Sequence, residues 1–171
     1  MSVSLKQLIE TGNFGSVRLG MSREQVENSL GAPDDVGCTS RKYPKPSIWK
    51  YGDIELHFVP DADRLFQIYM DDFDMPSGGK LVGFDPWIIR RSLTLSEAEE
   101  YLTQSGITYE VGDHELEDNY STCVVAGVGV KLIFMGEDMS LHVVSYHDAA
   151  IKQPRTSITL CGQPQSRLEA T

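Results

Sequence analysis

Apolar and polar residues alternate in two stretches of the chain that are similar to each other. Residues 49–72 align with residues 125–148 without a gap. The matched apolar positions are Ile54, Leu56 and Phe58 in the first stretch and Val130, Leu132 and Phe134 in the second. Period-two alternation followed by a polar turn is typical of a β-hairpin. The pattern therefore predicts the same hairpin twice.

A segment with helix signals precedes each predicted hairpin. Ser22 is a candidate N-cap with Gln25 three residues later, and Ser96 and Glu99 repeat this spacing. A serine followed at this distance by Gln or Glu is the pattern of a capping box. The chain therefore predicts two units, each with one helix and one hairpin.

The segment between the two units is rich in aspartate, proline and glycine, which is typical of a linker. We expect one α+β repeat at residues 1–75, a second at 76–150, and a C-terminal strand or tail at 151–171. A single unit exposes the apolar face of its hairpin, and two units side by side bury it under their helices. The predicted fold class is α+β: two tandem helix–β-hairpin repeats that form one antiparallel sheet with the helices packed on one face.

Charge changes this picture by excluding some partners. The 171 residues carry 15 basic and 25 acidic side chains, a net charge of −10. Such a chain repels nucleic-acid phosphates and favours a basic protein partner. No apolar run approaches the roughly 20 residues that cross a bilayer, and the first residues lack a secretion signal. We expect no nucleic acid, no membrane and a cytoplasmic location.

The chemistry-bearing residues are dispersed along the chain. Cys38, Cys123 and Cys161 form no CxxC pair, and the histidines do not have the spacing of a zinc site. The glycines at 78, 79 and 83 lack the Lys-Ser/Thr pair of a phosphate-binding loop. We therefore expect no metal, no cofactor and no enzymatic activity. Cys123 is expected to be a small buried apolar residue.

The first unit resembles the SmpA/OmlA (BamE-like) family over roughly residues 16–70. The residues that carry the resemblance are Val17-Arg18-Leu19-Gly20-Met21-Ser22, Val26, Leu30-Gly31, Pro33, Trp49, Tyr51-Gly52 and Phe58. Two such units in tandem resemble the fold of the β-lactamase inhibitor proteins, in which a concave sheet grips a protein. The resemblance implies a protein-binding role.

Strand parity then selects candidate contact residues on the open face of the sheet. Trp49 and Tyr51 share the parity of Glu55 and His57, opposite the apolar hairpin positions; the alternative is that Trp49 belongs to the core. Aromatic side chains dominate binding energy at protein interfaces, and acidic residues in a predicted loop at 113–118 add charge. The predicted contacts are Trp49, Tyr51, Glu55, His57, Tyr69, Glu115, Glu117 and Tyr146.

These observations favour a non-enzymatic inhibitor. The first hypothesis is a bacterial immunity-type protein that neutralises a basic toxin through the open sheet face and the acidic loops. The step from fold to this role is an analogy. The alternatives are a structural adaptor of a protein complex, as the SmpA/OmlA resemblance implies, and a small-molecule-binding domain.

Overall fold

In the computed structural model, residues 2–38, 45–116 and 119–151 are described. They form an α+β fold built on a large antiparallel sheet, as the hydrophobic pattern predicts. The predicted C-terminal strand or tail lies outside the described residues, apart from residue 151. No helix in the described ranges is long and apolar enough to cross a membrane.

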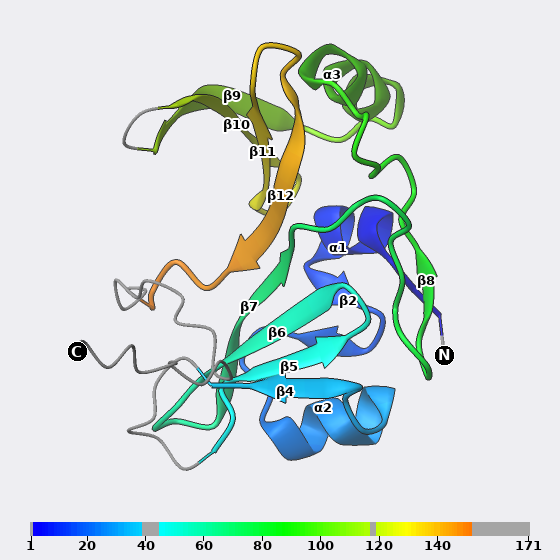
Figure 1. Cartoon of the computed structure of the whole chain (residues 1–171), viewed down its shortest axis with the longest axis vertical. Helices are drawn as coiled ribbons and strands as arrows, with labels where there is room; N and C mark the ends of the chain where they lie inside the picture. The colour runs from blue at the N-terminus through cyan, green and yellow to red at the C-terminus, as the bar shows by residue number, and fades with distance from the viewer. Residues whose placement is uncertain (1, 39–44, 117–118, 152–171) are drawn as a thin grey trace, which may run out of the picture.

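Eight strands form one continuous sheet in the order β4-β5-β6-β7-β12-β11-β10-β9, with every neighbouring pair antiparallel. Figure 1 shows β7 and β12 side by side at the middle of this sheet. The strands of the first half are β4 Asp35–Gly37, β5 Ile48–Tyr51, β6 Ile54–Val59 and β7 Arg64–Met70. Those of the second half are β9 Tyr109–Leu116, β10 Asn119–Ala126, β11 Val130–Met135 and β12 Ser140–His147.

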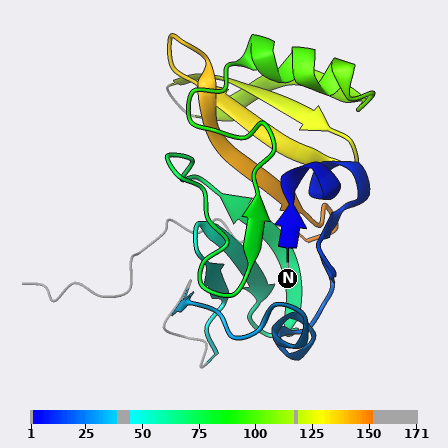
Figure 2. The ribbon, with the colours of Figure 1, turned by 90° about the vertical axis from the view of Figure 1, so that its right-hand side faces the viewer.

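The helices of the described residues all lie on one side of the sheet, as Figures 1 and 2 show from two directions. They are α1 Leu5–Thr11, α2 Arg23–Leu30 and α3 Leu95–Gln104. Two small two-stranded sheets accompany them: β1 Ser2–Ser4 with β8 Gly83–Asp85, and β2 Asn13–Phe14 with β3 Val17–Arg18.

Four strands of the large sheet follow α2 and four follow α3, so each half contains more than the one predicted hairpin. A turn at residues 52–53 divides β5 from β6, and a turn at residues 127–129 divides β10 from β11. In both cases a glycine inside an apolar run marks a chain reversal. The second turn is one residue longer, so β5 and β10 correspond only after a one-residue shift.

The two halves share their local irregularities. A register shift follows His57 in β6 and Ile133 in β11, which align with each other in the sequence. Asp63 and Met139, also aligned, both have a positive φ, 44° and 48°. At the centre Tyr69 of β7 pairs with its aligned residue Ser145 of β12. The two halves therefore share these irregularities at aligned positions on either side of the β7–β12 pair.

A capping box begins α2 and another begins α3. Ser22 accepts a hydrogen bond from the backbone N–H of Gln25, as predicted. For α3 the predicted box at Ser96 and Glu99 is wrong, because Thr94 and Glu97 form it. The sequence around residue 95 contains this spacing twice, and helix periodicity does not decide between starts that are two residues apart.

The core lies between the helices and the sheet. The alternating residues of β6 and β11 that were predicted to face inward are all buried: Ile54, Leu56, Phe58, Val130, Leu132 and Phe134. Leu5, Leu8 and Ile9 of α1 are also buried. These apolar side chains form a single cluster that extends over both halves of the sheet.

The helix α1 also touches the second half of the molecule. The N–H of Val128, in the turn between β10 and β11, donates to the carbonyl oxygen of Ile9 at 3.0 Å. Gly127 in the same turn has a φ of +56°, and a Cβ there would lie 1.9 Å from that oxygen. A glycine is therefore required at this close approach.

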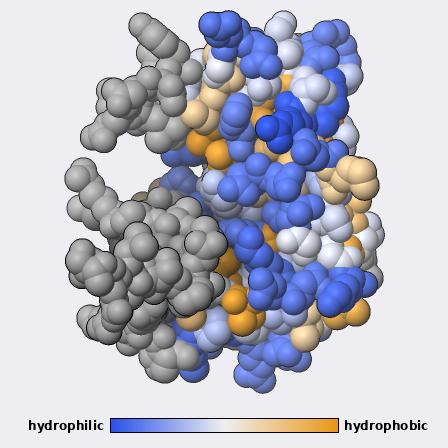
Figure 3. Space-filling model, in the orientation of Figure 1, coloured by the Kyte–Doolittle hydropathy of each residue, from blue (hydrophilic) through white to orange (hydrophobic). Residues whose placement is uncertain are grey.

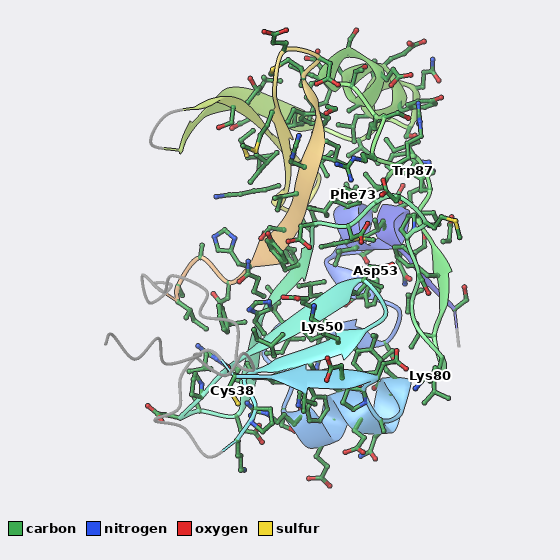
Figure 4. All side chains as sticks on the ribbon, viewed as in Figure 1. Cys38, Lys50, Asp53, Phe73, Lys80 and Trp87 are labelled. Atoms are coloured by element: carbon green, nitrogen blue, oxygen red, sulfur yellow. The ribbon has the colours of Figure 1, made fainter. Side chains whose placement is uncertain are left out.

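The predicted linker is tied to the first half by backbone hydrogen bonds. The carboxylate of Asp34 accepts from the N–H groups of Gly52 at 3.0 Å and Lys80 at 3.3 Å. The N–H of Asp53 donates to the carbonyl oxygen of Ser77 at 3.0 Å. The turn between β5 and β6, where Figure 4 labels Asp53, therefore packs on the connecting segment. The repeat boundary near residue 75 stays a prediction.

Candidate protein-binding face

The face of the eight-stranded sheet that points away from α1, α2 and α3 is named here the open face. No helix among the described residues covers it (Figure 1). Neighbouring strands place one row of residues across its centre, in register from β5 to β10: Lys50, Glu55, Tyr69, Ser145, Lys131 and Val125. The chemistry of this face changes along the row.

The first half of the open face carries a charged cluster. Glu55 lies between two partners, with Oε2 2.8 Å from Nε2 of His57 and Oε1 2.6 Å from Nζ of Lys50. The side chains of Glu55 and His57 are only 17% and 16% exposed. The hydrogen bond with His57, followed by that with Lys50, lowers the pKa of Glu55 to about 2 despite burial. The Glu55 carboxylate is therefore ionised at neutral pH.

Aromatic rings surround His57 on this face. The ring of Phe66 lies edge-on to His57 at 6.3 Å between centroids, and the ring of Tyr69 lies at 5.9 Å. The Tyr69 hydroxyl donates to Asp71 at 3.3 Å. Burial, followed by the charge of Asp71, raises the pKa of Tyr69 to about 12. The phenol therefore keeps its proton at neutral pH and offers a rigid amphipathic surface.

At the joint between the halves, polar side chains connect β7 and β12. The buried amide of Gln67 donates to the Ser145 hydroxyl at 3.0 Å. His147 is in register beside Gln67, and burial, assisted by the charge of Lys131, lowers the pKa of His147. His147 is therefore neutral at neutral pH, and the centre of the open face is polar with little net charge.

The second half of the open face carries an apolar row beside Lys131 and Ser145. Cys123, Ile133 and Val143 are neighbours in register across β10, β11 and β12. Cys123 and Ile133 are each 8% exposed, and Val143 is half-buried. Cys123 is buried as predicted, and burial raises the pKa of its thiol. This surface was not predicted, although its signal is present in the sequence. β10 and β11 carry consecutive apolar residues, which indicates strands with two apolar faces.

Two of the predicted contacts lie on the core face instead. Trp49 is 9% exposed, with its ring 5.2 Å from that of Phe58. Tyr51 is 1% exposed and its hydroxyl donates to the carbonyl oxygen of Gly31 at 2.8 Å. A two-residue turn makes Tyr51 and Ile54 direct partners, so both side chains share one face. Parity counted through the turn gave the wrong face for Trp49 and Tyr51.

Tyr146 is also on the helix side. It pairs with Ile68, whose side chain is buried in the core. Its hydroxyl oxygen would lie 2.8 Å from a Cβ at Gly12, the residue that ends α1. Tyr146 therefore packs under the helix, and its predicted place on the open face is wrong. Glu55, His57 and Tyr69 are the predicted contacts that the structure brings together there.

The predicted acidic loop at 113–118 is in part a strand. Residues 113–116 belong to β9, where Glu115 pairs with Tyr120 of β10. Glu117 lies outside the described residues. The acidic residues of this stretch led to the prediction of a loop, because charged residues are uncommon in strands except at sheet edges.

No group of three or more His, Cys, Asp or Glu residues in the described ranges is arranged to hold a metal ion. The surface seen in Figure 3 is mostly hydrophilic, with scattered apolar residues between charged ones. Comparisons of the chain with models of protein families, with curated proteins and with solved structures found no match. The open face is therefore the feature of the molecule that bears on function.

Proposed function

We propose that this protein is a non-enzymatic, cytoplasmic inhibitor that binds a basic protein on its open face, in the manner of an immunity protein that neutralises a toxin. One observation carries the proposal: helices cover one face of the sheet, and the other face presents Glu55, His57 and Tyr69 beside apolar side chains. A surface that combines amphipathic aromatic side chains with apolar ones suits protein association. The net charge of −10 favours a basic partner.

The proposal includes a tandem repeat. The aligned register shifts and the aligned positive-φ residues Asp63 and Met139 support two copies of one helix-and-sheet unit. Such a pair is similar to the concave two-unit sheet of the β-lactamase inhibitor proteins, and its first unit resembles the SmpA/OmlA family. These resemblances favour protein binding over a small-molecule pocket.

The first test identifies the partner. The tagged protein is expressed in its native host and the proteins that co-purify are identified by mass spectrometry. A basic protein recovered in a one-to-one complex, whose toxicity or enzymatic activity is lost on binding, supports the inhibitor. Recovery of the components of an assembly complex supports the structural adaptor instead.

The second test locates the contact. Tyr69→Ala is expected to weaken binding of the identified partner at least about tenfold, since buried tyrosines are frequent interface hot spots. Tyr101→Ala is the matched control, because Tyr101 is 38% exposed on α3, on the far side of the sheet. Equal affinity of the two variants in calorimetric titrations would exclude the open face as the contact.

A further inference from the structure

The last strand of the second half ends the sheet. β9 spans Tyr109–Leu116 and pairs along its whole length with β10 on one side. Within the described residues no strand pairs with its other side. The strand at the opposite end, β4, has only three residues. β9 is therefore the long free edge of this sheet, with unpaired backbone groups that suit an added strand.

Two turn hydrogen bonds identify which groups of β9 face outward. The N–H of Gly127 donates to the carbonyl oxygen of Thr108, and the carbonyl oxygen of Ala126 accepts from Gly129 on the β11 side. Hydrogen-bonded and non-hydrogen-bonded pairs alternate in an antiparallel ladder. The pair Tyr109–Ala126 is thus non-hydrogen-bonded, and so is Val111–Val124. It follows that the N–H and C=O groups of the odd-numbered residues 109–115 point to the free edge.

We propose that β9 receives an extended, lysine- or arginine-bearing segment of the partner protein as an added antiparallel strand. The inference rests on the proposed protein-binding function and adds a mode of contact at the edge of the same sheet. Backbone hydrogen bonds supply a continuous ladder for such a segment. Val111, which is 48% exposed, offers an apolar contact beside it.

The acidic residues of β9 indicate which kind of segment can pair with this edge. β9 contains Glu110, Asp113 and Glu115 and no lysine or arginine. A second copy of the chain paired about Asp113, a register that brings the outward-pointing groups of the odd-numbered residues together, would place Asp113 opposite Asp113. Like charges directly opposite each other destabilise a strand pair. A basic strand places opposite charges across the ladder. The composition of β9 therefore disfavours self-association and favours a basic segment.

The binding test uses labelled peptides of the length of β9, with alternating lysine and valine or alternating glutamate and valine. The lysine peptide is expected to bind in fluorescence anisotropy titrations, and the glutamate peptide is expected not to bind. Val111→Pro is expected to lower the affinity for the lysine peptide about tenfold, because one hydrogen bond is lost and the proline ring adds bulk at the edge. Pairing with β10 is retained, because the Val111 N–H points outward. Val111→Thr, which keeps the N–H, is the control, and equal affinity of the two variants would overturn the inference.

Amide hydrogen exchange provides a second readout on the unmodified protein. The lysine peptide is expected to slow exchange at Val111, Asp113 and Glu115, with little change at Glu110 and Gly112, whose N–H groups already pair with β10. Protection on β6, β7 and β12 alone would overturn strand addition and leave the open face as the contact. If amide exchange is slowed on β9 and Tyr69→Ala leaves binding of the partner unchanged, strand addition is retained and the open face is rejected as the contact. A dimer of the free protein in sedimentation experiments would also overturn the inference.

Discussion

The two halves of the sheet share a register shift and a positive-φ residue at aligned positions, and they differ in the chemistry of the open face. In the first half Glu55, His57 and Tyr69 form a polar and aromatic surface. At the corresponding positions the second half carries Lys131, Ile133 and Ser145. The inward positions differ little in character. Burial under the helices constrains the core face to apolar residues, and the open face is free to change.

The halves also differ in what supports their hairpin turns. The turn between β5 and β6 packs on the connecting segment through Ser77, and the turn between β10 and β11 packs on α1 through Ile9. The donors are the N–H groups of Asp53 and Val128, and the glycine before each of them lies close to the accepting oxygen. The connecting segment and α1 thus lie outside the eight-stranded sheet, and each supports a turn in one half of it.

The largest expected effect is the loss of unfolding free energy when either of two core phenylalanines, one in each half, is replaced by alanine. Phe58→Ala and Phe134→Ala are each expected to destabilise the protein by about 3–5 kcal/mol, because both side chains are fully buried. Phe58→Ala is expected to cost more, since its ring also contacts Trp49 and lies 4.5 Å from the Arg23 guanidinium. Urea unfolding measures both free energies. A larger loss for Phe134→Ala would show that these ring contacts do not distinguish the halves. Tyr101→Ala, on the surface, is expected to change stability by less than about 0.5 kcal/mol.

A smaller effect tests the supports of the two turns. Gly127→Ala and Gly52→Ala place a Cβ 1.9 Å from the Ile9 oxygen and 2.4 Å from the Ser77 oxygen. Each is expected to lower the free energy of unfolding by about 2–4 kcal/mol, through steric conflict and a strained φ. Gly129→Ala is the control: its φ is +108° but nothing lies near its Cβ, so a loss of only ~1 kcal/mol is expected. Equal losses at all three glycines in thermal unfolding would show that φ alone matters.

The smallest expected effect is a pH-dependent change in stability that arises only in the first half. The folded-state pKa of Glu55 is about 2, below its ordinary value of 4.5. A lowered carboxylate pKa stabilises the fold above the ordinary pKa, and this stabilisation is lost as the pH falls through the folded pKa. Glu55→Gln is therefore expected to lose on the order of 1–2 kcal/mol at neutral pH and nothing near pH 2, after allowance for solvent screening.

Unfolding free energies measured across this pH range check the prediction. Glu100→Gln, on the exposed surface of α3, is the matched control and is expected to leave the pH dependence unchanged. The second half has Lys131 at the position of Glu55 and lacks this acid-sensitive contribution. An unchanged pH dependence in Glu55→Gln would show that the ion pairs with His57 and Lys50 do not stabilise the fold.

The sequence predicted what depends on local chemistry. The α+β class, the Ser22 capping box and the inward faces of β6 and β11 are confirmed. The turns at 52–53 and 127–129 were not recognised, because a glycine in an apolar run is compatible with a bulge as well as a reversal. That ambiguity reversed the predicted faces of Trp49 and Tyr51. The place of Tyr146 depends on α1, which approaches from a distant part of the sequence and has no local signal at residue 146.

The contact between α1 and the turn at residue 128 has a consequence for synthesis of the protein. During synthesis α1 emerges long before Val128, whose backbone N–H donates to the carbonyl oxygen of Ile9. The β7 strand likewise waits for β12 with one edge unpaired. Contacts between such distant residues slow folding, and an exposed strand edge promotes aggregation. Completion of the fold is therefore delayed until nearly the whole described chain is available, and a truncated product leaves the edge of β7 exposed.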